Sequence, residues 1–376
     1  MINDKIIKRQ IIDEIEQYLP IDSIVVLHGA RQVGKTFIMR YLMAFLENKN
    51  EIVYYIDLED SRFKIKLDEG PDSLIGILKD AGRVNDKKTD KKIFVFIDEI
   101  QYLKNPSSFL KLIADHHRYL KLIVSGSSSF DIKNKFKNSL VGRTINFEIF
   151  PLSFREFLTF KNYHAIPDKI YTSIKINELA GLFNEYVIFG GYPAVVLEPS
   201  IQIKEKLLQQ IIDTYIKKDI SELGNITEID KFNKLVEVLA SQSGQMLNVT
   251  ELSNTCNITK QTIEKYLFIL ENTYIIKLVR PYSRNIRSEL FKTPKIYFYD
   301  TGLAQMLWLK SLPKEIIGNI FETSIFSELV KKFGHNNIYY WRTMDKKEID
   351  FILNVKNDIL PIEAKVNFAQ FNKTAV

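Results

Sequence analysis

The feature that most constrains the fold is a series of five short apolar runs in the first 150 residues, separated by helical or loop-like stretches. The runs are SIVVLHG (23–29), EIVYYIDL (51–58), KIFVFIDE (92–99), LKLIVSGS (120–127) and TINFEIF (144–150). Strands that are apolar along their whole length are buried on both faces, as in parallel sheets covered by helices on each side. The sequence therefore predicts an α/β domain with a parallel sheet over residues 1–150, beginning with a helix over 5–19.

The first apolar run leads into a glycine-rich loop that is followed by a helical pattern. The loop consists of Gly29, Ala30, Arg31, Gln32, Val33, Gly34, Lys35 and Thr36. This is a complete G-x-x-x-x-G-K-T spacing in a strand–loop–helix context, where backbone N–H groups close around phosphates. Lys35 is expected to contact the β- and γ-phosphates, and Thr36 to ligate Mg²⁺. The cofactors predicted from this loop are ATP and Mg²⁺.

An acidic pair ends the third apolar run. Asp98 follows the buried strand residues directly, and Glu99 comes next. Asp98 is placed to complete the Mg²⁺ shell with Thr36, and Glu99 to orient or deprotonate the attacking water. A solvated acidic strand end is the alternative, but the complete phosphate loop disfavours it. The pair predicts hydrolysis of ATP rather than binding alone.

Two further residues are candidates for the reaction. Ser127, with Ser125 as second choice, ends the fourth run and is expected to sense the γ-phosphate; a simple serine-rich turn is equally compatible. Arg143 precedes the fifth run and could act as an arginine finger on a neighbouring subunit, although surface arginines are common. His116 and His117 have no partner at metal-ligand spacing and are interpreted as structural.

The order of several motifs supports a family resemblance. LHGARQVGKT, VFIDEIQYL, IVSGSSS, GRTINFEIFPLSFREFL and FGGYP together resemble a prokaryotic family of AAA+-type P-loop ATPases that carry a C-terminal domain of unknown function. The resemblance covers nearly the whole chain. It implies an AAA+-like ATPase domain (1–150), a helical lid (151–224), a winged-helix module (225–310) and a small α+β nuclease-like segment (311–376).

Residues 231–272 carry a helix-turn-helix pattern, with helices expected over 231–244, 249–256 and 260–273. On the third helix Thr259 is a candidate N-cap, and one face is apolar. That face consists of Ile263, Tyr266, Leu267 and Leu270. The runs 274–282 and 295–300 are expected to form a wing. Basic residues in or near it suit contacts with phosphates of double-stranded DNA. They are Arg280, Arg284, Arg287 and Lys292. A module that binds proteins or only packs against the ATPase is an equal alternative.

Carboxylates recur near the C-terminus, after a helix expected over 321–333. A two-residue loop at Lys356-Asn357 would place Asp350 opposite Glu363, on one sheet face with Lys365. This resembles the PD-(D/E)xK nuclease core, with Glu328 as the further acid of a possible second metal site. The alternative is a charged hairpin, or a nuclease-like fold that is kept for its structure after the activity was lost. The chain ends at Val376, so the nuclease-like layer is expected to be incomplete.

Composition narrows the class of protein. The chain of 376 residues has one cysteine, so it forms no internal disulfide, and a reducing cytoplasm is expected. No run of about 18 apolar residues is present, so no membrane partner is expected. We expect an ATPase whose nucleotide state controls its C-terminal modules, acting on or near DNA. The alternative is a regulatory switch that gates a protein–protein interaction or self-association without DNA binding or nuclease activity.

Overall fold

The computed structural model describes residues 7–84, 91–126, 140, 142–163, 172–283, 293–343, 345, 347–356 and 358–365. The chain divides into two compact units, Met1–Ile149 and Phe150–Val376. The lid, the module and the nuclease-like segment expected from the sequence all lie in the second unit. Their internal boundaries at 224 and 310 stay predictions.

The N-terminal unit is built on a five-stranded sheet whose strands all run parallel, in the order β2-β3-β4-β1-β5. The strands are β1 (Ile24–His28), β2 (Ile52–Asp57), β3 (Ile93–Asp98), β4 (Leu120–Gly126) and β5 (Thr144–Glu148). Each coincides with one predicted apolar run. In the register, Asp57 lies beside Asp98 and Leu27 beside Ser125. The polar strand ends therefore meet at one edge of the sheet.

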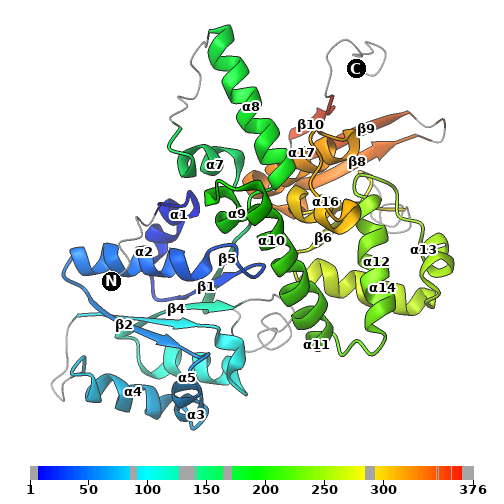
Figure 1. The fold of residues 1–376 in the computed structure, drawn as a ribbon. Helices are drawn as coiled ribbons and strands as arrows, with labels where there is room; N and C mark the ends of the chain where they lie inside the picture. The colour runs from blue at the N-terminus through cyan, green and yellow to red at the C-terminus, as the bar shows by residue number, and fades with distance from the viewer. Residues whose placement is uncertain are drawn as a thin grey trace. The chain divides into compact units, whose positions relative to one another are not determined.

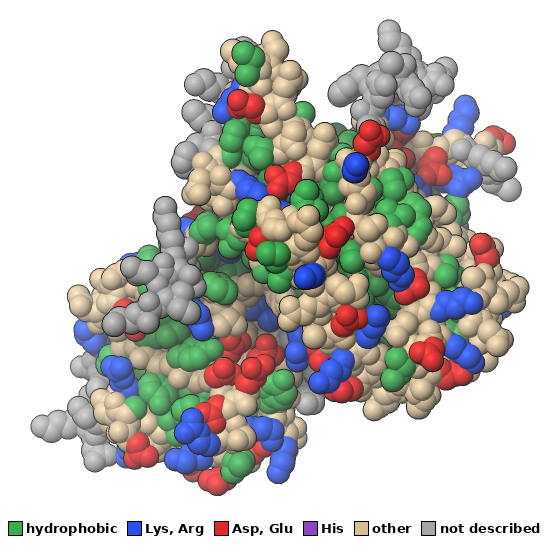
Figure 2. Space-filling model, in the orientation of Figure 1, with side chains coloured by type: hydrophobic (Ala, Val, Ile, Leu, Met, Phe, Trp, Pro, Cys, Tyr) green, Lys and Arg blue, Asp and Glu red, His purple; other side chains and the backbone are tan. Residues whose placement is uncertain are grey.

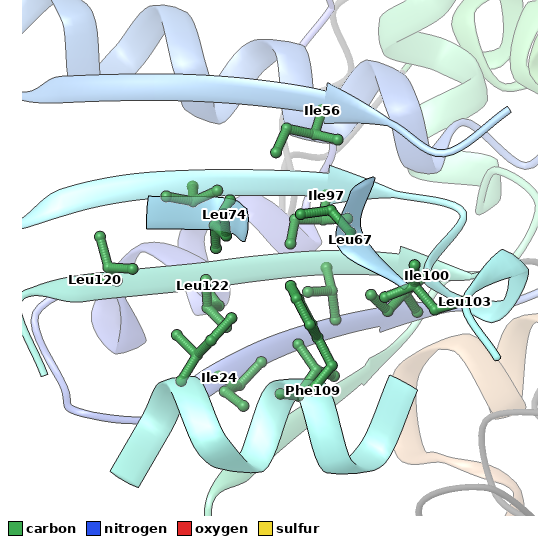
Figure 3. Close-up of a cluster of buried hydrophobic side chains, with 14 of the residues drawn as sticks. Ile24, Ile56, Leu67, Leu74, Ile97, Ile100, Leu103, Phe109, Leu120 and Leu122 are labelled. Atoms are coloured by element: carbon green, nitrogen blue, oxygen red, sulfur yellow. The ribbon is translucent and has the colours of Figure 1, made fainter. Parts of the chain in front are cut away.

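Helices cover both faces of this sheet, as the burial of its strands requires (Figure 1). They are α1 (Ile11–Tyr18), α2 (Lys35–Asn48), α3 (Ser61–Leu67), α4 (Pro71–Asp80) and α5 (Pro106–His116), with the 3₁₀ turn η1 (Ile100–Tyr102). On one face, side chains of α3, α4 and α5 pack on the strands (Figure 3). Phe109 of α5 lies there against Ile24 and Leu122 (Figure 3). The parallel α/β fold predicted from the sequence is confirmed.

The C-terminal unit is mainly helical and ends in a small sheet. Its first helices are α7 (Phe154–Phe160), α8 (Ser173–Phe189), α9 (Pro193–Leu197), α10 (Ile201–Ile211), the π-helical segment η2 (Ile212–Ile220) and α11 (Ser221–Leu223). α16 (Thr301–Leu309) packs on α8, α10 and α12 (Ile229–Ser241). An aromatic cluster of Phe154, Phe157, Phe183 and Tyr186 joins α7 to α8.

The FGGYP motif marks a place where backbone packs directly on backbone. A Cβ at Gly191 would lie 2.4 Å from the carbonyl oxygen of Leu152, and one at Gly302 would lie 2.2 Å from that of Phe189. The buried carboxylate of Asp300 accepts hydrogen bonds from the backbone N–H of Gly191 (2.7 Å) and of Leu303 (2.9 Å), which caps α16. The segment from α7 to α9 is therefore joined to α16 by contacts that tolerate no side chain.

Residues 229–298 form a three-helix-and-hairpin module. α12 is followed by α13 (Val249–Cys256), α14 (Lys260–Asn272) and an antiparallel pair of strands, β6 (Ile276–Val279) and β7 (Lys295–Phe298). The four apolar residues predicted to form one stripe of α14 are all buried. The Thr259 side chain caps this helix by accepting from Thr262 N (3.2 Å). Arg284, Arg287 and Lys292 lie outside the described residues.

The chain then forms α17 (Gly318–Phe333), the 3₁₀ turn η3 (His335–Asn337) and a three-stranded antiparallel sheet. Its strands are β8 (Ile338–Arg342), β9 (Glu348–Val355) and β10 (Asp358–Ile362), in the order β10-β9-β8. Val355 pairs with Asp358 and Phe351 with Ile362, so the connection has two residues. β10 ends at Ile362, and the same register continued by one pair places Asp350 opposite Glu363, the arrangement expected from the sequence.

Candidate active site

The glycine-rich loop connects β1 to α2 at the edge where the parallel strands end. Gly34 (φ 97°) and Gln32 (φ 61°) take left-handed backbone conformations, which turn the loop before the helix begins at Lys35. A Cβ at Gly29 would lie 2.0 Å from the carbonyl oxygen of Ile149, so only glycine fits there. The loop backbone is therefore held in one tight conformation, as a phosphate cradle requires.

Lys35 lies inside this loop, with 5% of its surface exposed. Its Nζ donates to the carbonyl oxygens of Gly29 (3.1 Å) and Ala30 (2.8 Å). Burial lowers the pKa of Lys35 to about 8, although Glu99 and Asp98 favour its charged form. An ammonium ion that is desolvated and bonded only to carbonyls would gain strongly from an anionic ligand.

Thr36 and Asp98 meet as predicted for a metal-binding pair. Thr36 Oγ1 donates to Asp98 Oδ2 over 2.7 Å, although the two residues lie 62 positions apart in the chain. Mg²⁺ is held in nucleotide sites by one or two protein oxygens together with phosphates and water. A hydroxyl and a carboxylate fit that requirement. Among the described residues, no group of three or more His, Cys, Asp or Glu forms a metal cage.

Two neighbouring strands hold the Asp98 carboxylate in place. Tyr55 of β2 donates its hydroxyl to Asp98 Oδ2 (3.0 Å), and Ser125 of β4 donates its hydroxyl to Asp98 Oδ1. Burial, with Asp98 nearby, raises the pKa of Tyr55, so it stays a hydrogen-bond donor. Ser125, the second choice from the sequence, thus contacts the site, while Ser127 lies outside the described residues. Sequence reasoning missed Tyr55.

Glu99 follows β3 in a left-handed conformation (φ 55°, ψ 48°), which is uncommon for a residue with a side chain. Its N–H donates to Asp98 Oδ1 (3.1 Å) and to Ser125 Oγ (3.3 Å). Its carboxylate accepts a hydrogen bond from the amide of Gln101. Strained backbone that is held by several hydrogen bonds is typical of catalytic positions, because it sets the direction of the side chain.

Arg9 and Glu59, two other residues of this edge, were not expected from the sequence, whereas Arg31 was named there as part of the loop. Arg9, which is buried, donates from Nη1 to the carbonyl of Val33 (2.8 Å) and so supports the loop from outside. Arg31 interacts with Tyr102, and burial together with Asp57 and Glu99 raises the pKa of Glu59. Apart from the Asp57–Glu59 pair, these residues are distant in the sequence, and the fold brings them together.

Arg143 lies at the other edge of the sheet, where β4 and β5 begin. Its guanidinium pairs with Asp115, with Nε 2.7 Å from Oδ1. It lines a pocket of about 410 Å³ together with Asp22, Lys92, Arg118 and Lys121. Parallel strands have their two ends at opposite edges, so Arg143 cannot reach the phosphate loop of its own chain. A role as an arginine finger therefore requires a neighbouring subunit.

The C-terminal carboxylates form a separate cluster in the second unit. Lys295, nearly fully buried, contacts Glu322 of α17 (3.0 Å) and Glu348 of β9 (2.5 Å). Burial opposes the charge of Lys295, but the two carboxylates outweigh it and its pKa is raised. Lys365 pairs with Glu363 (2.8 Å). Glu322, Glu348 and Glu363 are therefore each paired with a lysine of the chain itself.

Glu328 does not join this cluster, and this corrects the expectation from the sequence. Its carboxylate accepts hydrogen bonds from Tyr186 Oη (2.6 Å) and from Phe154 N (3.1 Å), which ties α17 to the lid. Glu322 takes the position facing Asp350 instead. The two glutamates are six residues apart, so they point about 120° apart around the helix.

Asp350 gives the cluster a pH dependence. Burial raises its pKa to about 6, with Glu322 and Glu363 adding to the effect. The folded protein thus holds this proton more tightly than the unfolded chain, whose pKa is 3.8. The contribution of this proton to the stability of the fold is complete below pH 3.8 and is lost as the pH rises through about 6.

We therefore expect Asp350→Asn to stabilise the C-terminal unit at pH 7 by roughly 1–3 kcal/mol, with no gain below pH of about 4. Urea unfolding followed by tryptophan fluorescence measures this, because Trp308 and Trp341, the two tryptophans, both lie in this unit. Asp358→Asn, an exposed position on β10 of the same sheet, is the control and should leave the pH dependence unchanged. The same pH dependence of unfolding in Asp350→Asn and Asp358→Asn would contradict the assignment of the raised pKa to Asp350.

Comparison with known proteins agrees with the geometry of the two units. The model of an AAA domain matches residues 22–158. Two further models, Domain of unknown function (DUF8612) and Domain of unknown function (DUF4143), match residues 180–314 and 317–374. The chain thus combines an AAA-type P-loop ATPase domain with C-terminal domains of unknown function. The family resemblance drawn from the sequence motifs is confirmed.

Relatives of this AAA-type chain share nearly its whole length. An uncharacterized protein of Methanocaldococcus jannaschii is 29% identical over 352 residues, 92% of this chain and 75% of that protein. An uncharacterized protein of Haemophilus influenzae is 25% identical over 368 residues, 94% of this chain and 84% of that protein. A Walker-type ATPase of Pyrococcus abyssi matches with a TM-score of 0.50 at 16% identity, over 81% of this chain and 97% of that one. This last likeness shows the fold. In the part of the AAA-type chain that the structure describes, no helix has the length and apolar character needed to cross a bilayer.

Proposed function

We propose that this chain hydrolyses ATP with the help of Mg²⁺ at the edge where β1 and β3 end. The observation that carries the proposal is the 2.7 Å hydrogen bond between Thr36 and Asp98, directly beside the buried ammonium of Lys35. A hydroxyl and a carboxylate that would hold the ion, with a lysine for the phosphates, form the set that phosphoryl transfer needs.

Each residue has a distinct role in the proposed reaction. Lys35 would neutralise charge on the β- and γ-phosphates, and Thr36 and Asp98 would hold Mg²⁺, which would supply further neutralisation there. Glu99 orients the attacking water once its carboxylate leaves the amide of Gln101. Ser125 keeps Asp98 in position. Ser127 as γ-phosphate sensor and Arg143 as a finger from a neighbouring subunit complete the proposal.

We also infer that the partner of the ATPase is a protein rather than DNA, which reverses the order of the two hypotheses drawn from the sequence. α14 exposes Lys260 and Lys265, but Glu264 and Phe268 are exposed beside them. On the face shown in Figure 2, basic and acidic side chains are interspersed over the C-terminal unit. Duplex DNA is bound mainly through basic surface that contacts its phosphates. The described surface of the three-helix-and-hairpin module supports the regulatory switch.

Steady-state ATP hydrolysis by the full chain tests both the proposed ATPase activity and the inference that the partner is a protein. We expect Mg²⁺-dependent turnover that is the same with and without double-stranded DNA, at low and at moderate salt. Stimulation by DNA that fades as salt rises would instead indicate phosphate contacts and overturn the protein-partner inference. Absence of any turnover, with or without DNA, would overturn the proposed ATPase activity itself.

A further inference from the structure

A groove of about 880 Å³ runs across the three-helix-and-hairpin module. One wall is α14, and the others are the start of α13 and the base of the β6–β7 pair. The residues that line it are Met246, Leu247, Asn248, Val249, Glu251, Glu264, Leu267, Phe268, Glu271, Leu278, Arg280, Thr293 and Pro294. The groove lies within one compact unit and is open to solvent along α14.

Among the described residues that line the groove, acidic side chains outnumber basic ones. Three glutamates line it, at positions 251, 264 and 271, together with Arg280. Glu271 is partly neutralised, because it accepts hydrogen bonds from Lys277 Nζ and Leu278 N, both at 3.0 Å. Glu251 and Glu264 are exposed, and neither carboxylate has an ion pair or hydrogen bond with any described residue. They are available to a ligand that carries positive charge.

Two large apolar side chains are exposed on the groove beside these charges. Phe268 is 52% exposed and Met246 is 37% exposed, although both are large hydrophobic side chains. Leu247 and Leu267 close the floor beneath them and are themselves buried. An exposed aromatic ring and a methionine beside a formed hollow are typical of a surface that binds an apolar side chain of a partner.

We propose that this groove is the docking site for a basic segment of a partner protein that inserts an apolar anchor beside Phe268. The lysines or arginines of the segment pair with Glu251 and Glu264, and its apolar side chains cover Phe268 and Met246. The inference rests on the proposed protein-partnered ATPase and adds the chemistry of the partner. Amphipathic segments that lie in grooves are a common mode of protein recognition.

The charges of the described lining residues favour this occupant over nucleic acid. A DNA backbone placed along α14 would bring its phosphates against Glu264 and Glu271, which are about one and three helical turns from Lys260. Like charges at such distances oppose binding. The same glutamates attract a basic peptide, so the charges favour its binding.

Binding of synthetic peptides to the full chain, measured by fluorescence anisotropy without nucleotide, tests the proposal. The probes are an amphipathic leucine–lysine peptide, the same peptide with glutamate in place of lysine, and a short DNA duplex. The variants are Glu264→Lys and Phe268→Ala. The matched controls are Glu222→Lys, an exposed glutamate of α11, and Ile229→Ala, which is 47% exposed on α12; neither lines the groove.

We expect only the leucine–lysine peptide to bind, with affinity lost about tenfold or more in each groove variant and unchanged in both controls. Equal binding of the glutamate peptide, equal loss in the controls, binding of the duplex in place of the peptide, or no binding would each overturn the proposal. All four positions are exposed, so the variants are expected to fold, which tryptophan fluorescence verifies. Failure of ATP hydrolysis would leave this result untouched.

Discussion

Replacing Lys35 with methionine is expected to lower the affinity for ATP by at least about 100-fold and to abolish measurable turnover. The variant would lose the charge-assisted hydrogen bonds that the Lys35 ammonium is expected to donate to two phosphates, each worth roughly 1.5–3 kcal/mol. Methionine keeps most of the apolar stem and therefore most of the packing. Binding of a fluorescent ATP analogue measures the change. Retention of wild-type affinity would show that the loop between β1 and α2 is not a phosphate site.

Lys121 provides a closely matched control for this substitution. It is also buried, its Nζ also donates to backbone carbonyls, including those of Tyr18 (2.8 Å) and Ile21 (2.7 Å), and burial lowers its pKa to about 8 as well. It lies where β4 begins, at the edge away from the phosphate loop. Lys121→Met is therefore expected to reduce stability while the folded protein binds ATP normally. Equal loss of binding in both variants would point to misfolding.

The pH dependence of ATP binding separates a direct role of Lys35 from a structural one. In the nucleotide-free protein, the pKa of Lys35 is about 8, and an anionic phosphate would favour its charged form. ATP affinity is therefore expected to be constant below pH of about 7 and to fall as the pH rises through 8. Lys35→Met should remove this fall, and Lys121→Met should keep it.

The second large effect is expected for Glu99→Gln, which should lower kcat by about 100- to 1000-fold while ATP still binds. Glutamine keeps the size of the side chain but cannot take a proton or orient water as strongly. Removal of a negative charge near the γ-phosphate should leave binding equal or tighter. A single-turnover assay with bound ATP separates the two steps.

Glu59→Gln is the matched control for Glu99. Both carboxylates lie at the same edge, and Glu99 itself contributes to the raised pKa of Glu59. We expect turnover of Glu59→Gln to stay close to that of the unmodified chain. A similar loss in both variants would mean that the total negative charge of this edge, rather than Glu99, governs hydrolysis.

Local patterns predicted the N-terminal unit well. Five apolar runs became five parallel strands, and the loop from Gly29 to Thr36 lies where a strand gives way to a helix. Each of these signals is contained within about ten residues, because backbone geometry and burial act over short distances. The register of the last hairpin was equally accessible, since a two-residue loop fixes which residues oppose each other.

Contacts between segments that are distant in the sequence could not be predicted from local patterns. Tyr55 reaches Asp98 only because β2 and β3 are neighbours in the sheet, which no local pattern reveals. Glu322 and Glu328 look alike in the sequence, and the packing of α17 decides that the first meets Lys295 and the second meets Tyr186. The exposed face of α14 was visible from its period, but the hollow beside it depends on the hairpin that packs there.

The glycines at the junction of the lid and α16 also limit how the C-terminal unit can move. An interface made of side chains can slide when rotamers change, whereas one in which carbonyl oxygens touch α-carbons has no such freedom. Since α16 also packs on α12, the lid and the three-helix-and-hairpin module are expected to shift together as one rigid body. The shape of the groove is then expected to stay constant when the C-terminal unit moves.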